Sequence, residues 1–198
     1  MTTNFDSLPP HFVRQGVAYH QFVIMGATLV GDVTPNSLIS NAPPLAPGEP
    51  DHVSIITGTH TGMVNVGIVQ LNRRPLESVP GYDAIAEASI GRHAGGDIYV
   101  SDPELGRNNE LGVINADASY LRLRVSAAGR SDNFDGGGIA DRERYLLVTW
   151  PEPPSRSMVL VTDAVNDELL RSWRPHGALS APRRAPARVT AVRRPPDC

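Results

Sequence analysis

Lysine is absent from this sequence: all 18 of its basic residues are arginine. A protein surface has no physical need for that choice, because lysine is usually the commoner solvated cation. Codon usage biased toward G and C accounts for it, and the 18 glycines and 18 prolines fit the same cause. The missing lysine therefore excludes no function and indicates none.

Cysteine and long apolar runs are scarce as well. Cys198 is the only cysteine, which excludes a disulfide framework within the chain and a zinc site built from cysteines. No apolar run approaches the ~18 residues that a membrane helix needs. The first residues show no basic region followed by an apolar stretch, so we expect no secretory leader. These absences predict a cytoplasmic protein without membrane contact.

The chain also lacks the alternation of strands with long helices that builds a doubly wound fold. Short runs rich in β-branched and aromatic residues alternate instead with Gly- and Pro-rich turns. This pattern predicts an all-β antiparallel sandwich of about 8–10 short strands, with at most one short helix that begins at Asp163. Strands are predicted over 16–25, 27–30, 52–58, 63–72, 83–90, 97–100, 111–114, 120–127, 144–150 and 158–162.

Composition divides the chain into three parts. Residues 1–15 are expected to be a polar lead-in, residues 16–173 the β-sandwich domain, and residues 174–198 a disordered tail rich in Arg, Pro and Ala. Within the domain, residues 34–51 contain five prolines, so we expect a long surface loop there without regular structure.

Two patterns make sharper predictions about strand packing. The strands over 52–58 and 63–72 are separated by a short polar turn, so they are predicted to pair as a β-hairpin. Residues 120–127 alternate strictly, with Leu121, Leu123 and Val125 on one face. The opposite face, with Arg122, Arg124 and Ser126, is predicted to lie in solvent.

Charge is unevenly distributed. Six arginines and one acid give residues 174–198 a net charge of +5, so the rest of the chain carries −8. An acidic body argues against a nucleic-acid-binding surface on the fold itself. The arginines of 183–194 could contact phosphates, but no aromatic residue beyond Trp173 offers a stacking platform. A solvated tail is the favoured interpretation of that segment.

Motifs that carry chemistry are missing. The six histidines show no metal-ligand spacing, and neither a Gly-x-Ser-x-Gly elbow nor a phosphate-binding loop is present. His20 is expected in the core or in a cross-strand contact, and 136–138 as a mobile hairpin tip rather than a cation site. One arrangement stays open, a metal held by His52, His60 and Asp51 across the hairpin. We predict no catalytic residue, no cofactor and no metal site.

One stretch resembles a known family. Residues 17–24, Val-Ala-Tyr-His-Gln-Phe-Val-Ile, are similar to the first strand of competence protein J and its relatives. Further segments resemble related actinobacterial proteins: 60–68, 83–89, 120–130 and 143–154. The likeness extends in pieces over residues 17–161, and the proline-rich loop, the Gly-rich turn and the arginine tail depart from it. Competence protein J inhibits a DNA-entry nuclease, so the resemblance implies a small all-β module that binds a protein without catalysis.

Two functions follow as expectations. The first is a non-catalytic protein-binding module, of the immunity or nuclease-inhibitor type. An acidic body suits a basic nuclease or toxin as its partner, because opposite fields speed encounter. The alternative is an enzyme or a carbohydrate-binding β-sandwich whose site lies in loops that the sequence does not mark.

Overall fold

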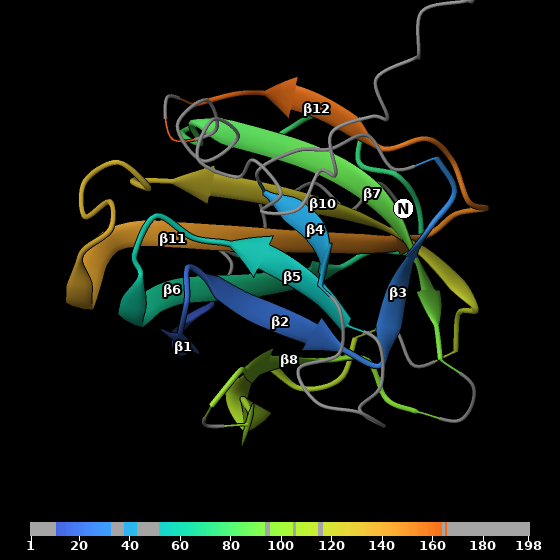
Figure 1. Ribbon diagram of the computed structural model, residues 1–198. Helices are drawn as coiled ribbons and strands as arrows, with labels where there is room; N and C mark the ends of the chain where they lie inside the picture. The colour runs from blue at the N-terminus through green and yellow to red at the C-terminus, as the bar shows by residue number, and fades with distance from the viewer. Residues whose placement is uncertain are drawn as a thin grey trace, which may run out of the picture.

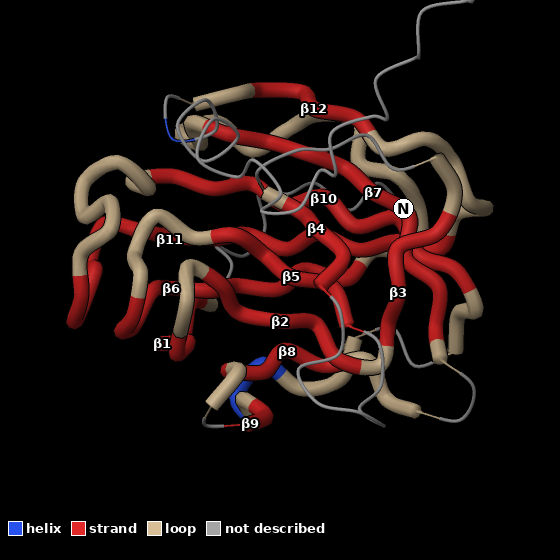
Figure 2. Tube along the Cα trace, viewed as in Figure 1, coloured by secondary structure: helices blue, strands red, loops and turns tan. Residues whose placement is uncertain are grey.

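The chain is described by a computed structural model, which covers residues 11–32, 38–42, 52–93, 96–104, 106–114, 117–163 and 165. Strands dominate the described residues (Figure 2), and the one short 3-10 helix among them is η2, Asn109–Leu111. The strands form two sheets that face each other across one core. The predicted all-β sandwich is therefore confirmed. No helix in the described part of the chain is long and apolar enough to cross a membrane.

The larger sheet has seven strands, in the order β1-β6-β11-β10-β7-β12, and β3 also pairs with β7. β12 pairs with β7 near Ala86, whereas β3 pairs with the same edge near Ile90. All of these pairs are antiparallel except β6 with β11, which run parallel. The strands are β1 (Phe12–Val17), β3 (Ala27–Val30), β6 (Thr61–Gln70), β7 (Ala84–Arg92), β10 (Tyr120–Ala128), β11 (Gly137–Pro151) and β12 (Met158–Val161).

The smaller sheet has five strands, in the order β4-β5-β2-β8-β9, and its pairs are all antiparallel. It lies across the larger sheet in Figure 1. Its strands are β2 (Gln21–Met25), β4 (Ile39–Ala42), β5 (His52–Ile56), β8 (Tyr99–Asp102) and β9 (Gly106–Arg107).

The chain passes between the sheets through very short connections. β1 and β2 lie in different sheets but are joined by three residues, and only Gly26 separates β2 from β3. Gly26 has φ 75°, and a Cβ there would lie 2.1 Å from the Asp97 carbonyl oxygen. Only glycine fits both the left-handed backbone and the close approach.

Sequence periodicity identified most strands but not their neighbours. The predicted hairpin of 52–58 with 63–72 is wrong, because β5 lies in the smaller sheet and β6 in the larger one. The lead-in 1–15 is also shorter than predicted, since β1 begins at Phe12. Within the predicted loop 34–51, residues 39–42 form β4 on the edge of β5, because prolines flank but do not interrupt that short run.

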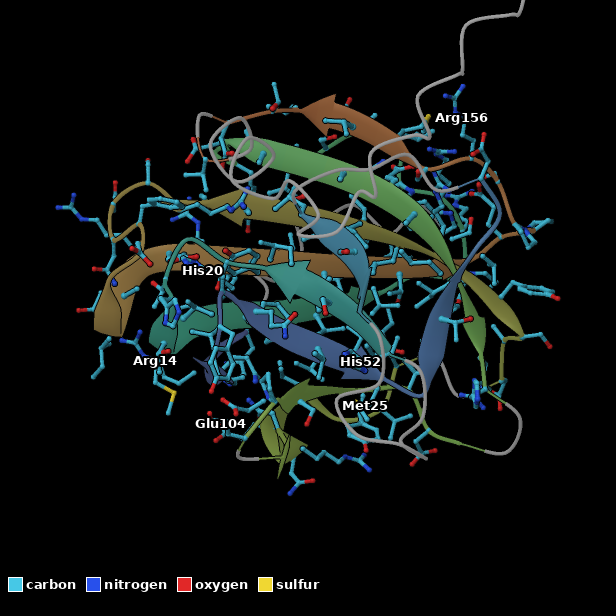
Figure 3. The ribbon with its side chains drawn as sticks, in the orientation of Figure 1. Arg14, His20, Met25, His52, Glu104 and Arg156 are labelled. Atoms are coloured by element: carbon cyan, nitrogen blue, oxygen red, sulfur yellow. The ribbon has the colours of Figure 1, made fainter. Side chains whose placement is uncertain are left out.

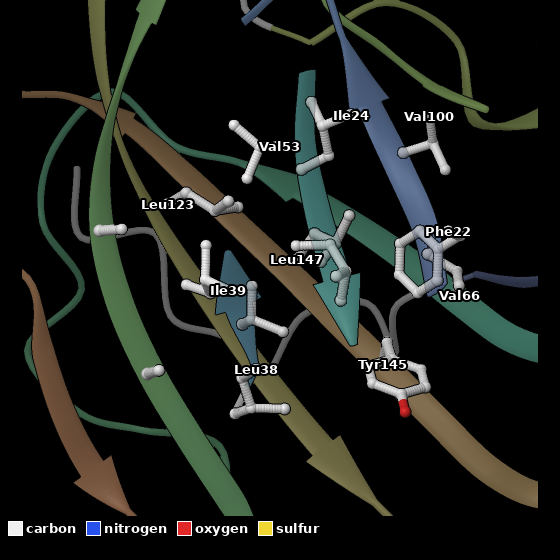
Figure 4. Close-up of a cluster of buried hydrophobic side chains, with 14 of the residues drawn as sticks. Phe22, Ile24, Leu38, Ile39, Val53, Val66, Val100, Leu123, Tyr145 and Leu147 are labelled. Carbon is white, nitrogen blue, oxygen red and sulfur yellow. The ribbon is translucent and has the colours of Figure 1, made fainter. Parts of the chain in front are cut away.

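The core between the sheets is built from alternate residues of both layers. Phe22 of β2 meets Tyr145 of β11 edge to face, with ring centroids 5.4 Å apart (Figure 4). Leu121, Leu123 and Val125 point into this core, as the alternation predicted. Such burial of apolar surface, at about 25 cal/mol per Å², is the main favourable term for a fold of this kind.

The outer face of the larger sheet is not wet, which corrects the sequence-based prediction for β10. Arg122, Arg124 and Ser126 are only 0%, 6% and 2% exposed. The segments 71–82 and 152–157 lie over this face. The Glu77 carbonyl oxygen of the first accepts a hydrogen bond from Arg124, and the Ser155 carbonyl oxygen of the second accepts one from Arg122. A second apolar cluster forms there from Leu146, Val148 and Trp150 with Val69, Leu71, Val79 and Tyr82. Alternation shows which residues share a face, but not whether another segment covers it.

Three further predictions lie outside the described residues. They concern most of the proline-rich loop, nearly all of the helix predicted after Asp163, and the tail 174–198.

Candidate functional site

Three connections meet at one end of the sandwich, on the left in Figure 1. They are the β1–β2 turn (18–20), the β5–β6 loop (57–60) and the β10–β11 loop (129–136). Backbone hydrogen bonds join the first two: the His20 amide donates to the His60 carbonyl at 3.0 Å, and the Thr57 amide to His20 at 2.8 Å. The second and third are joined by His60 N to Gly136 O at 2.9 Å and by Asp135 N to Gly58 O at 3.0 Å. These bonds fix the three connections relative to one another.

Each connection contributes one side chain to a cluster of possible metal ligands. One ligand atom each from His20, His60 and Asp135 lies within 4.8 Å of the other two. His20 Nε2 is 3.3 Å from Asp135 Oδ1, and the two imidazole centroids are 4.8 Å apart. Among the described residues, this is the only group of three or more His, Cys, Asp or Glu side chains at such spacing. We call it the His-His-Asp cluster.

Neighbouring polar groups orient both rings. His20 Nδ1 lies 3.2 Å from the Thr57 carbonyl oxygen and Nε2 lies 3.3 Å from Asp135 Oδ1, so each ring nitrogen faces an oxygen acceptor. In the tautomer that donates from Nδ1 to Thr57, the lone pair on Nε2 would face an ion held between His20 and Asp135. His60 Nδ1 contacts Thr61 Oγ1 at 2.8 Å. A metal-binding histidine is usually oriented by a hydrogen bond between its second ring nitrogen and a carbonyl, a hydroxyl or another polar group.

Backbone strain is concentrated at the same place. Among the described residues, the non-glycine positions with positive φ are Tyr19 (55°), His20 (60°) and Asp135 (56°). Tyr19 and His20 form a two-residue turn closed by two 3.1 Å bonds between Ala18 and Gln21. Asn-Gly is the favoured pair in such a turn, and a bulky residue there costs about 1–2 kcal/mol. Strain at two of the three cluster residues indicates that their side chains serve a purpose other than stability.

A buried carboxylate fixes the loop that carries His60. Glu143 of β11 is 1% exposed and accepts bonds from Gly58 N (2.7 Å), Thr59 N (3.0 Å) and Thr59 Oγ1 (2.6 Å). The Tyr145 hydroxyl donates to it as well. Burial raises the pKa of Tyr145 well above its usual value, and the Glu143 charge raises it further, so this donor keeps its proton.

The Gly58 position leaves no room for a side chain, and Gly58→Ala should destabilise the protein. A Cβ there would lie 1.9 Å from the Arg130 carbonyl oxygen, so the β5–β6 and β10–β11 loops would have to separate. We expect the free energy of unfolding to fall by about 2–3 kcal/mol, measured by urea denaturation. Gly96→Ala, where nothing lies within 4 Å, is the control and should change it by less than about 0.5 kcal/mol. Equal stability of the two variants would contradict the close packing of these loops.

The structure places the histidines differently from the sequence-based expectation. His52 begins β5, whereas His60 lies in the loop beyond the other end of that strand. Roughly 13 Å of strand separates them, so they do not form a joint site. His52 is buried beside Met25, apart from His20 (Figure 3), and Asp51 lies outside the described residues. The expectation of a core or cross-strand His20 is wrong, because His20 lies in the turn with its side chain 21% exposed.

The sequence did not connect Asp135 with the histidines, because Asp132, Asp135 and the Gly-rich segment after them favoured a hairpin tip over a cation site. The three cluster residues are separated by 40 and 75 positions in the sequence, so no local spacing could reveal them. The one available signal is a tyrosine and a histidine at a two-residue turn between strands, where small residues are favoured.

Comparison with known proteins gave no match: no family model, no curated protein and no solved structure is similar to this chain. The resemblance to competence protein J therefore stays a prediction.

The donor set of the cluster defines its chemistry. Two imidazoles and one carboxylate bind Zn²⁺ in catalytic sites and Fe²⁺ in two-histidine, one-carboxylate centres. Three protein ligands leave at least one coordination position for water or for the oxygen of a ligand. An ion held there would act as a Lewis acid and would lower the pKa of a bound water.

Proposed function

We propose that this protein binds a divalent transition-metal ion, Zn²⁺ above all, through His20, His60 and Asp135, and that the open coordination position binds an oxygen of its ligand. The protein would then be a metal-dependent enzyme or binding protein with a site built from loops. The observation that supports this most directly is the convergence of three ligand atoms within 4.8 Å from three separate connections.

The donor types favour zinc over the common hard cations. Mg²⁺ and Ca²⁺ select oxygen ligands, whereas the cluster supplies two nitrogens for one carboxylate. When His20 donates from Nδ1 to the Thr57 carbonyl oxygen, Nε2 is the neutral nitrogen available to a borderline ion such as Zn²⁺.

The function that the sequence favoured, a non-catalytic inhibitor of a nuclease or toxin, stays a prediction. Its support is the net charge of −8 before residue 174, which suits a basic partner. The two functions are separable by experiment, because an inhibitor of that kind needs no metal.

Zinc binding tests the proposed function directly. Chelator-treated protein should bind one Zn²⁺ per chain in a calorimetric titration. His60→Gln and Asp135→Asn should each weaken binding by about 100-fold, because each removes one of three ligands. His93→Gln is the matched control, since His93 is an exposed histidine outside the cluster. Wild-type affinity in either cluster variant, or no binding to the wild type, would contradict the proposal.

His20→Asn provides a variant that separates ligation from folding. Asparagine tolerates the left-handed backbone better than most residues, so this change should leave stability within about 0.5 kcal/mol of wild type without metal. It should nevertheless abolish most zinc binding. Thermal melts with and without Zn²⁺ measure both effects: wild type should be stabilised by the ion and His20→Asn should not. A zinc-dependent shift in the variant would show that His20 is not a ligand.

A further inference from the structure

Two exposed aromatic rings flank the His-His-Asp cluster. Tyr19 is 69% exposed and Phe134 is 38% exposed, although large aromatic side chains are usually buried. Tyr19 contacts the ring of His60 edge-on, with centroids 6.0 Å apart. Phe134 stacks on His20 at 5.8 Å with an interplanar angle of 30°. The four rings therefore form a chain, Tyr19–His60–His20–Phe134, with a phenol at one end and a phenyl at the other.

The charge of the surrounding loops selects against ionic ligands. The three connections, 18–20, 57–60 and 129–136, contain two carboxylates, Asp132 and Asp135, and one arginine, Arg130. Arg130 is 1% exposed and pairs with Asp163 at 3.2 Å. With Zn²⁺ bound, the charges of the ion and of these two carboxylates cancel. A phosphate or carboxylate ligand would therefore find no exposed side-chain cation in these loops to pair with.

The arrangement is open and mixes polar with apolar groups. Asp135 is 71% exposed at its side chain, so a ligand would lie on the surface and not inside a closed cavity. Thr61 Oγ1 contacts His60 Nδ1, and Asn133 donates to Thr59 Oγ1, so neutral hydrogen-bonding groups lie near the cluster. A matching ligand has no net charge, an apolar face to lie on an aromatic ring, and several hydroxyls or carbonyls.

We propose, as an extension of the metal site proposed above, that the ligand is a neutral carbohydrate. One face of a sugar ring lies on Tyr19 or Phe134, and a hydroxyl oxygen of the same saccharide occupies the open coordination position of the metal. Because the site is exposed, it accepts one end or one unit of a longer glycan.

The test begins with zinc binding and then measures glycan binding. The zinc-loaded protein is applied to an array of neutral and acidic glycans, and affinities for maltotriose, cellotriose, xylotriose, chitotriose and any retained glycan are measured by calorimetry. We expect binding to a neutral glycan that is lost when a chelator removes the metal. Tyr19→Asn, which tolerates the left-handed backbone, and Phe134→Ser should each weaken it by about tenfold or more. Both variants should still bind one Zn²⁺ per chain.

Tyr120→Ala is the matched control. Tyr120 is 48% exposed at the start of β10, the end of that strand opposite the β10–β11 loop, and its replacement should leave glycan binding unchanged. A zinc-loaded protein that retains no glycan, that prefers phenyl phosphate, or that binds glycans equally in the chelator would overturn the carbohydrate proposal while the metal site stands. Failure to bind zinc in the first step would overturn both.

Discussion

Glu87→Gln should lower the free energy of unfolding by about 3–5 kcal/mol, the largest effect that we expect from a single near-isosteric change. Glu87 of β7 is fully buried on the outer face of the larger sheet. Its carboxylate accepts from Arg122 Nε at 3.2 Å and from Arg124 Nε at 2.8 Å, and Arg74 Nη2 lies 2.6 Å away. Glu87 is therefore a fully buried anion that contacts three guanidinium groups.

The physical reason is the charge that the substitution leaves behind. Arg122 has no exposed surface and Arg124 almost none, and arginine does not lose its proton in proteins. Their remaining partners are neutral carbonyl and hydroxyl oxygens and the ring of Trp150, 5.5 Å from the Arg124 guanidinium carbon. These contacts do not replace a carboxylate in a medium of low polarity.

Urea denaturation with a constant m-value measures this loss. Asp32→Asn is the control, because Asp32 pairs with Arg156 at 3.7 Å where both side chains are more than 70% exposed. That change should alter stability by less than about 1 kcal/mol. A loss below about 1 kcal/mol for Glu87→Gln would mean that the arginines find adequate partners without the carboxylate.

Glu143→Gln should weaken both the fold and zinc binding. The carboxylate accepts from two backbone amides and two hydroxyls, whereas an amide side chain has a single acceptor oxygen and would direct an NH₂ group at one of these donors. The lost charge-assisted bonds predict a decrease in the free energy of unfolding of about 2–4 kcal/mol. His60 follows Thr59 directly, so a loosened loop should also reduce zinc affinity by about tenfold or more.

Both effects are measured on the same preparations, by urea denaturation and by calorimetric titration with Zn²⁺. Glu104→Gln removes an exposed carboxylate on the other sheet and should change neither quantity. Tyr145→Phe removes one of the four donors and should give an intermediate loss of stability. Unchanged zinc affinity in a destabilised Glu143→Gln would show that this carboxylate supports the fold without positioning His60.

Local pattern was sufficient for the strands and insufficient for the site. The alternation of residues 120–127 predicted β10 and the face that carries Leu121, Leu123 and Val125, because side chains in a strand alternate with period two. The same period cannot indicate that a distant segment covers Arg122 and Arg124. The environment of these arginines depends on Glu87 and on chain segments more than thirty residues away.

By itself the sequence determined the class of fold: apolar residues with period two, broken by Gly- and Pro-rich turns, have no better way to be buried than in packed sheets. Tertiary structure alone decided which strands pair, and therefore that β5 and β6 lie in opposite sheets. It also brought His20, His60 and Asp135 to one end of the sandwich. Ligand geometry is a relation between atoms in space, and connections 40 and 75 residues apart acquire it only when both sheets have formed.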